Sequence, residues 1–466
     1  MLGLNEKLKE LAAQDKSIKV GIVGLGQMGL CLVSHLEGIK GFRVCAVSDL
    51  NAGKAGQIKK IFGPRGTDIV AWENTELKEG GILNLQEILQ NCEAGNIANV
   101  GGLSNIGKER LNAAVRHGSV IFTNDFSVLW QIEDIDVIVD ATGFTASGAE
   151  IALGALCAGK DVVTLNVETD VTVGPILKKI AENKNRVYTL SAGDEPAALK
   201  ELYDFADGMG FKIVCAGKGK NNPLDCQANP ETLAEYAAKK GSSAKMMTSF
   251  VDGTKSMVEM ACLSNATGLV PDVRGMHGLH ADIKDIVSKF CLKAQGGVLE
   301  KEGVVDFVIG DLAPGVFLVY STENKLVKDT INYLNLGKGP NYLLYRPYHL
   351  TNIETPLSVA LAYFNRQAWI APQNGGLVSE VITVAKKDLA AGEVLDGIGG
   401  YTVYGQIELY GTAKKEGCLP IGLAQGCVLK QGIKKGEPVL NDNIDFQKNP
   451  IIMQLRKMQE ETIQGQ

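Results

Sequence analysis

Residues 18–29 read IKVGIVGLGQMG, a short apolar run that ends in three glycines with the spacing GxGxxG. A helical pattern follows from Leu30 to Leu36, and a second apolar run from Arg43 to Ser48 ends at Asp49. A strand, a Gly-rich turn, a helix and a strand that ends in an acid form the context in which this spacing binds a dinucleotide. The alternative is a structural Gly-rich turn. We predict a dinucleotide-binding βαβ unit.

Each glycine of this loop has a separate physical role in that prediction. The first permits a tight turn, the second lets the backbone approach a pyrophosphate, and the third lets the helix pack closely on the strand. Amide groups and the helix dipole then face the phosphates. An acid after the second strand favours NAD, because it would repel a 2′-phosphate. The candidate cofactor-binding residues here are Gly24, Gly26, Gln27, Met28, Gly29 and Asp49.

Apolar runs and helical patterns continue to alternate along the chain, with strands expected at 119–122, 137–139, 161–165, 186–190 and 212–216. Such alternation predicts an α/β fold, a Rossmann-type doubly wound parallel sheet. The stretch 62–105 does not fit the pattern and is expected to be an insertion. Mixed segments up to 372 predict an α+β substrate domain, and short strands with Gly turns predict a small β-rich domain. The expected domains are 1–216, 217–372 and 377–445.

Composition limits the classes of function. The chain has 466 residues, 45% of them hydrophobic, and a formal charge of −6, which argues against a broad nucleic-acid surface. Its 10 Cys form no CxxC pair, and no apolar stretch is long enough to span a bilayer. We therefore expect a cytoplasmic enzyme with a small polar substrate and with neither nucleic acid nor membrane as partner.

Polar residues follow several of the expected strands, where ligands of open α/β sheets bind. Small residues end the run 137–143, so the backbone there can lie against a cofactor; the alternative is an ordinary turn. These strand-end candidates are Ala141, Thr142, Gly143, Asn166, Glu168, Asp194, Lys218 and Lys220. The five polar residues from Asn166 onward have the alternative interpretation of a helix cap or a solvated loop charge.

Residues 248–265 hold the most suggestive polar pattern of the second domain. Asp252 is expected to cap a helix on which Lys255 and Glu259 are four residues apart. The pair is either a surface pair or a catalytic one, in which Lys255 protonates or polarises a carbonyl group and a carboxylate orients the substrate. Lys220 could act in the same way. The candidate catalytic residues are Lys220, Asp252, Lys255 and Glu259.

A metal site is a weaker hypothesis from the residues alone. Asp194, Asp252 and Glu259 offer the oxygen ligands that hard cations prefer. His277 and His280 form an HxxH in a Gly-rich loop, but no third ligand is evident.

Five motifs together resemble one known family: GLGQMG, VVTLNVETDVTVGP, AGDEPAAL, TSFVDGTKSMVEMA and GKGPNYLLYRPYHL. The chain resembles the deoxyxylulose phosphate reductoisomerase-like (DRL) family of homoserine dehydrogenase-like oxidoreductases. Its C-terminal segment resembles a SAF (antifreeze-like) domain. The resemblance implies NADPH-dependent rearrangement and reduction of 1-deoxy-D-xylulose 5-phosphate, assisted by a divalent cation such as Mg²⁺ or Mn²⁺, in a homodimer.

The resemblance also implies roles for the candidates. It places Lys220, Asp252, Lys255 and Glu259 around the substrate. It places Asn166 and Glu168 near the nicotinamide, as residues that contact the cofactor. The family's preference for NADPH conflicts with Asp49, which favours NADH. The expected cofactor is therefore NADPH or NADH. In homoserine dehydrogenase the strand before the nicotinamide resembles VVTANK. The matching residues 162–167 of this chain end in Val167 in place of the lysine, which argues against homoserine as the substrate.

Three functions follow from these patterns. The first is an NAD(P)H-dependent oxidoreductase acting on a phosphorylated or polyhydroxylated carbonyl compound. The second is a dehydrogenase of a homoserine-like or sugar-derived alcohol. The third is a non-catalytic dinucleotide sensor whose SAF-like segment engages a partner.

Overall fold

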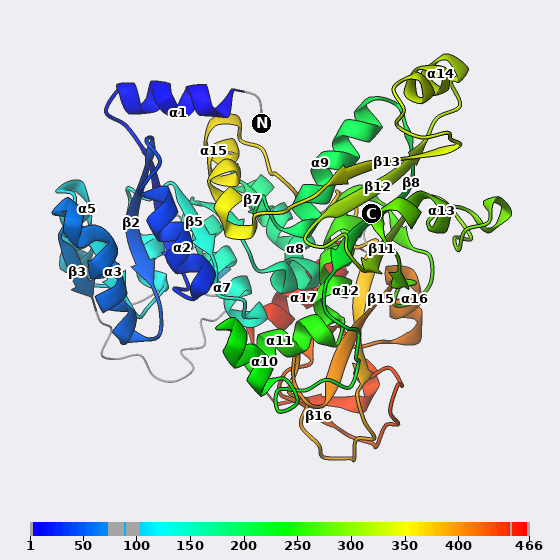
Figure 1. Ribbon diagram of the computed structural model, residues 1–466. Helices are drawn as coiled ribbons and strands as arrows, with labels where there is room; N and C mark the ends of the chain where they lie inside the picture. The colour runs from blue at the N-terminus through cyan, green and yellow to red at the C-terminus, as the bar shows by residue number, and fades with distance from the viewer. Residues whose placement is uncertain (1–2, 73–87, 90–102, 448–449, 464–466) are drawn as a thin grey trace. The chain divides into compact units, whose positions relative to one another are not determined.

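The computed structural model describes residues 3–72, 88–89, 103–447 and 450–463 (Figure 1). The predicted insertion at 62–105 lies largely outside these residues. The chain divides into two compact units, which are described separately. Unit 1 comprises Met1–Asp194, Leu350–Ala371 and Pro450–Gly465, and unit 2 comprises Glu195–His349 and Pro372–Asn449.

Unit 1 is built on a sheet of 7 parallel strands in the order β3-β4-β2-β1-β5-β6-β7. The chain leaves β1 toward β2 on one side and returns to β5 on the other. This reversal confirms the predicted doubly wound fold and puts its switch point between β1 and β5. The strands are β1 (Ile18–Val23), β2 (Phe42–Ser48), β3 (Ile69–Trp72), β4 (Val120–Thr123), β5 (Val137–Asp140), β6 (Asp161–Thr164) and β7 (Tyr188–Leu190).

Helices of unit 1 bury the apolar faces of these strands. One core packs the sheet against α1 (Leu4–Ala13), α2 (Gln27–Leu36), α3 (Ala55–Phe62) and α15 (Thr355–Asn365). The remaining helices are α5 (Asn105–Arg116), α6 (Ser127–Gln131), α7 (Thr145–Cys157), α8 (Val167–Asn183) and α17 (Ile451–Ile463). Strands that are buried along their length suit the short, nearly continuous apolar runs of the sequence.

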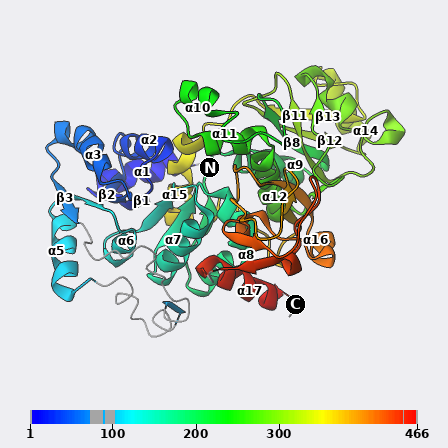
Figure 2. The same cartoon turned by 90° about the horizontal axis from the view of Figure 1, so that it is seen from below.

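Helix α17 lies beside α8 (Figure 2) and supplies hydrogen bonds where the backbone ladder of α8 is interrupted. Pro175 stands inside α8 and has no N–H to donate. The side-chain amide of Gln459 is inserted one residue later: its Oε1 accepts from Ile176 N at 3.1 Å, and its Nε2 donates to Thr172 O at 3.3 Å. Arg456 Nη1 donates to Thr172 O as well. The C-terminal helix therefore satisfies backbone groups that α8 leaves open.

Unit 2 contains a mixed sheet in the order β10-β11-β8-β12-β13, with β9 paired to β11. β8 is parallel to β11 and antiparallel to β12. Its strands are β8 (Lys212–Lys220), β9 (Val270–Pro271), β10 (Leu279–His280), β11 (Val304–Ile309), β12 (Val316–Ser321) and β13 (Asn341–Arg346). Its helices are α9 (Glu195–Gly208), α10 (Ala234–Lys240), α11 (Ala244–Val251), α12 (Thr254–Thr267), α13 (Ile286–Lys289) and α14 (Lys325–Tyr333).

This arrangement confirms the predicted α+β part. The predicted first domain runs to residue 216, whereas unit 2 begins at Glu195, so α9 and β8 belong to unit 2.

The C-terminal part of unit 2 forms small antiparallel sheets, which confirms the predicted β-rich segment. β14 (Ser379–Ala385) pairs with β15 (Val403–Leu409), and β16 (Cys427–Leu429) pairs with β17 (Ile444–Phe446). Helix α16 (Tyr410–Glu416) follows β15. The resemblance to a SAF domain stays a prediction. Across the described residues, no helix combines the length and apolar character needed to cross a membrane.

Helix α12 joins these small sheets to the rest of unit 2. All its residues except Lys255 are buried. Asn265 Oδ1 accepts from the backbone N of Val378 and of Ser379, and Ser264 Oγ lies 2.6 Å from Ser379 Oγ. The polar groups of a buried helix need such partners, so strand β14 and helix α12 are mutually dependent.

Replacing Gln459 by Leu should destabilise unit 1. The Leu side chain keeps most of the volume but leaves Ile176 N–H without its acceptor, which costs about 1–3 kcal/mol. Thermal and urea unfolding of the full chain measure the loss. Lys457→Leu on the same helix is the control, because its side chain is 79% exposed. Equal stability of Gln459→Leu and the wild type would contradict the role given to this amide.

Candidate functional site

The Gly-rich loop lies at the carboxyl end of β1, beside the end of β5. Gly24 has φ of +93°, and a Cβ there would lie 2.7 Å from Ala141 O. A Cβ on Gly29 would lie 1.8 Å from Gly24 O. A Cβ on Gly26 would meet no described atom within 4 Å. Two of the three glycines are therefore required by the protein's own backbone, whereas the second faces open space.

Open space at the second glycine is what a dinucleotide site needs. Gly26 is the N-cap residue of α2, and no side chain caps that helix among the described residues. Gln27 and Met28, the first residues of the helix, are exposed. The amides of the first turn and the positive end of the helix dipole then face a position that a phosphate can occupy. The residues present therefore fit a dinucleotide pyrophosphate.

Asp49 lies where the sequence predicted, next to the loop. Its Oδ2 accepts from Leu25 N at 2.7 Å, and its Oδ1 accepts from Asn51 N at 2.8 Å. Each carboxylate oxygen has two lone pairs, so both retain one for a ribose hydroxyl. Asp49 thus holds the glycine loop in place and keeps capacity for a sugar.

A buried carboxyl that the sequence analysis did not select ends β5. Asp140 is fully buried, and its Oδ1 accepts from Thr142 N at 2.9 Å and Thr142 Oγ1 at 2.7 Å. Thr164 Oγ1 donates to its Oδ2 at 3.2 Å. Burial raises the pKa of Asp140, and the hydrogen bonds from Thr142 act against the rise. Asp140 therefore shapes the small-residue turn formed by Ala141, Thr142 and Gly143.

Asn166 and Glu168 lie at the start of α8, on the next strand end. Asn166 is the N-cap: its Oδ1 accepts from Thr169 N at 3.1 Å, and its Nδ2 donates to Phe144 O at 2.9 Å. Glu168 is buried in the first turn. The cap interpretation holds for Asn166, and the nicotinamide contacts of both residues stay predictions.

The second cluster belongs to unit 2 and is centred on Lys218. This buried ammonium pairs with Glu195 Oε1 at 2.5 Å and with Glu259 Oε2. Burial alone would lower the pKa of Lys218, but the two carboxylates raise it well above the ordinary value. His349 Nε2 lies 3.5 Å from Glu195 Oε1. Lys218 is therefore a permanent cation held between two acids.

Lys220 lies two residues further along β8, so its side chain leaves the same face of the strand. Its ammonium donates to Pro223 O at 2.9 Å, to Phe250 O at 2.7 Å and to Asn222 Oδ1. Burial lowers the pKa of Lys220 to about 8, and the Lys218 ammonium acts in the same direction. Lys220 is therefore a lysine that can gain or lose a proton near neutral pH.

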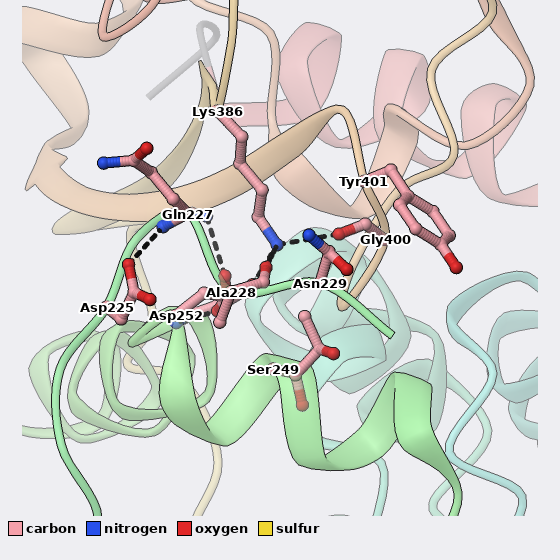
Figure 3. A network of polar contacts seen from close by, with 12 residues as sticks. Asp225, Gln227, Ala228, Asn229, Ser249, Asp252, Lys386, Gly400 and Tyr401 are labelled. Carbon is pink, nitrogen blue, oxygen red and sulfur yellow. Dashed lines mark hydrogen bonds and ion pairs between the residues drawn. The ribbon is translucent and has the colours of Figure 1, made fainter. Parts of the chain in front are cut away.

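The three candidates at the start of α12 have different surroundings. Asp252 precedes the N-cap Gly253, and its Oδ1 accepts from Thr254 N at 2.9 Å, so it caps the first turn from one residue further out than expected. Its Oδ2 forms an ion pair with Lys386 at 2.8 Å (Figure 3). Lys255 is half-buried.

Glu259 pairs with Lys218 rather than forming a simple surface pair with Lys255. Burial raises the pKa of Glu259, as does Glu195, whereas Lys218 and Lys255 lower it. Because Asp252 and Glu259 each face an ammonium group, much of the negative charge that a divalent cation requires is already balanced. Asp194, the third predicted metal ligand, is the last residue of unit 1 before Glu195.

Sequence reasoning missed Glu195 and Lys386 and named Lys218 without selecting it. Glu195 reads as an acid in the first turn of a helix, and Lys386 reads as a solvated charge after a strand. Neither carries a local signal, because their partners are distant in the sequence. In the HxxH motif, which was considered as a source of metal ligands, His277 Nε2 lies 2.9 Å from Asp272 Oδ2.

One family model matches part of the chain, and it is the family that the sequence motifs resemble. Residues 193–355 match the family model described as oxidoreductase DRL, catalytic domain. The match covers less than half of the chain and includes β8, α11 and α12. No curated protein sequence matches the chain.

The solved structures that match the chain are remote. A DOX-P reductoisomerase in complex with magnesium is 14% identical, with a TM-score of 0.40 over 75% of this chain and 70% of that chain. The 1-deoxy-D-xylulose 5-phosphate reductoisomerase from Zymomonas mobilis in complex with NADPH is 14% identical, with a TM-score of 0.37 over 75% and 71%. The myo-inositol 2-dehydrogenase from Lactobacillus plantarum is 16% identical, with a TM-score of 0.33 over 66% and 75%. At these values the likeness carries no argument about activity.

Two glycine substitutions should separate binding from folding. Gly26→Ala places a methyl group in open space, so stability should be unchanged while affinity for a reduced dinucleotide falls about tenfold or more, or about 1.4 kcal/mol. Gly29→Ala forces a methyl group against Gly24 O and should destabilise the chain by about 1–3 kcal/mol. Fluorescence titration and thermal unfolding measure the two effects. Undiminished affinity in Gly26→Ala would rule out a pyrophosphate at this loop.

Proposed function

We propose that this protein is an NAD(P)H-dependent oxidoreductase of the DRL type that reduces a small phosphorylated or polyhydroxylated carbonyl compound. The observation that carries the proposal is the glycine loop at the switch point of the sheet. Its geometry leaves an approach to the backbone only at Gly26, beside the uncapped first turn of α2. That arrangement is the one a dinucleotide pyrophosphate requires.

The substrate class rests on residues 193–355, which match the DRL catalytic domain. Within the proposal, 1-deoxy-D-xylulose 5-phosphate is the first candidate substrate. The cofactor is NADH or NADPH: Asp49 favours NADH, because a carboxylate repels the 2′-phosphate, and the family resemblance favours NADPH. The predicted homodimer and cytoplasmic location remain predictions.

Lys220 supports the chemistry that such a reduction needs. A bound reduced dinucleotide supplies a hydride, which carries two electrons to the carbonyl carbon. The carbonyl oxygen must then take up one proton to become a hydroxyl group. We assign that proton to the Lys220 ammonium, which must exchange one of its three hydrogen bonds within the protein for the carbonyl oxygen. Its pKa of about 8 is close to the operating pH of a general acid.

Lys218, Glu195 and Glu259 have a different part in this proposal. A lysine held between two carboxylates does not release its proton easily. Lys218 instead pairs with the two acids, and its positive charge helps to lower the pKa of Lys220. The carboxylates of Asp252 and Glu259 are paired with ammonium groups, so this mechanism does not use them as ligands of a divalent cation.

The assay that tests the function follows reduced-nicotinamide absorbance in the purified chain. It combines NADH or NADPH, Mg²⁺ or Mn²⁺, and 1-deoxy-D-xylulose 5-phosphate. Substrate-dependent oxidation is the expected result, and the faster cofactor decides the preference at Asp49. Dinucleotide binding without oxidation of either cofactor, across this substrate, sugar acids, polyols and homoserine-like alcohols, would favour a dinucleotide sensor instead.

Lys220→Met should lower the turnover number about 100-fold or more, since general acid catalysis contributes about 10²–10⁴-fold. In the wild type, the rate of reduction should fall as the pH rises above about 8, where Lys220 loses its proton. The variant should lack this decline and bind dinucleotide normally. Lys212→Met is the control, because Lys212 is on the same strand with an exposed side chain. An unchanged alkaline decline in Lys220→Met would assign the proton to another group.

A further inference from the structure

Lys386 is a buried lysine supplied by the β-rich C-terminal segment of unit 2. It follows the last residue of β14, and its side chain is 2% exposed. Its Nζ donates to Ala228 O at 2.7 Å and Gly400 O at 2.8 Å and pairs with Asp252 Oδ2 at 2.8 Å (Figure 3). An ammonium group loses much of its hydration in such a place, so these oxygens must replace the water.

The partner of Lys386 lies at the junction between α11 and α12. Asp252 follows the last residue of α11, and its other oxygen caps Thr254 N. Phe250, two residues earlier, provides the carbonyl oxygen that accepts from Lys220. Seven residues later, α12 presents Glu259 to Lys218. Asp252 therefore lies in the stretch of chain that supplies one contact to each of the two lysines of β8.

A second contact ties the same junction to the same C-terminal segment. Gly405 N of β15 donates to Thr254 Oγ1 at 2.9 Å. Asp225 N donates to Val251 O at 2.9 Å, which anchors the loop that contains Ala228 to the end of α11. The junction, the loop at 225–229 and the turn at 400 thus meet around one ammonium group (Figure 3).

The charge of Asp252 depends on this lysine. Burial raises the pKa of the Asp252 carboxyl, and the Lys386 ammonium opposes the rise most strongly. The charged and titratable groups around Lys220 are Lys218 on β8, Asp252 at the junction, Glu259 on α12 and Cys226 in the loop. The C-terminal segment contacts two of these groups: Tyr404 hydrogen-bonds to Cys226, and Lys386 pairs with Asp252, which is the carboxylate among them that faces a lysine of this segment.

We propose that Lys386 is a positioning residue for the reduction described above: it holds the ionised Asp252 carboxylate, and with it the α11–α12 junction, in the arrangement that Lys220 requires. This inference rests on the proposed function. It gives the C-terminal β-rich segment a place in catalysis, because that segment supplies the cation on which the junction depends. Lys386 itself touches no reacting atom in this scheme.

The experiment compares four full-length variants: Lys386→Met, Asp252→Asn, the double variant and Lys387→Met. The last is the matched control, because Lys387 is the next residue, is 54% exposed and pairs with Glu393. Each is measured for thermal unfolding, dinucleotide affinity, kcat and KM. Lys220 is also labelled with acetic anhydride across a pH series, and its extent of acetylation is read by mass spectrometry.

Lys386→Met should unfold at lower temperature, because a buried carboxylate is left without a cation. Assayed where it is folded, it should lose about tenfold or more in kcat, with KM changed less than about twofold and dinucleotide affinity unchanged. The double variant should regain most of the stability but not the turnover. Its Lys220 labelling midpoint should shift to lower pH, because the Asp252 charge that raises the pKa of Lys220 is gone.

Two results would overturn the inference. One is a folded Lys386→Met with the wild-type kcat and labelling profile. The other is a double variant that regains stability, kcat and the labelling midpoint together, which would make the pair purely structural. If the wild type reduces no carbonyl compound, the proposed function fails, yet the labelling midpoints still show whether Lys386 and Asp252 control Lys220. Lys387→Met should match the wild type in every measurement.

Discussion

The pairing of buried charge is the constraint on which unit 2 depends. Glu195, Glu259 and Asp252 are carboxylates that have lost most of their contact with water, and each lies beside a lysine ammonium. Removing one partner of a buried pair costs about 3–5 kcal/mol, because the other charge is left without compensation. The strands and helices that bring the lysines to these acids are therefore fixed relative to one another.

Helix α12 is the element through which this constraint acts. It presents Glu259 to β8 and Thr254 to β15, and it begins directly after the junction at Asp252. Near its other end, Asn265 binds the start of β14. A helix with polar groups on several sides and almost no exposure could not be stable alone. Its partners join the mixed sheet and the β-rich part of the chain in one folded unit.

Unit 1 depends on backbone approach rather than on charge. Gly24 and Gly29 let the end of β1, the start of α2 and the end of β5 come closer than any side chain would allow. Asp49 and Asp140 then hold the two turns by accepting backbone N–H groups. Of the three glycines of the loop, Gly26 is the one at which a ligand can approach the backbone. Preorganisation of this kind reduces what a ligand must spend on ordering its site.

The sequence by itself determined the class of the fold and the position of the glycine loop within it. Glycine spacing, an acid after the second strand and alternating apolar runs are local signals, and each reflects sterics or periodicity within about thirty residues. In the structure Gly29 lies against Gly24, and Asp49 accepts a hydrogen bond from the loop at Leu25, while the binding of a cofactor by these residues stays a prediction.

Only the tertiary structure decided which acids pair with which lysines in unit 2. Lys386 and Asp252 are 134 positions apart, and Lys218 and Glu195 belong to different elements. The same holds for Gln459, whose amide completes a helix almost three hundred residues earlier. A lysine on a strand end has the same local sequence whether it is solvated or buried. What separates the two cases is desolvation by distant segments, which no local pattern records.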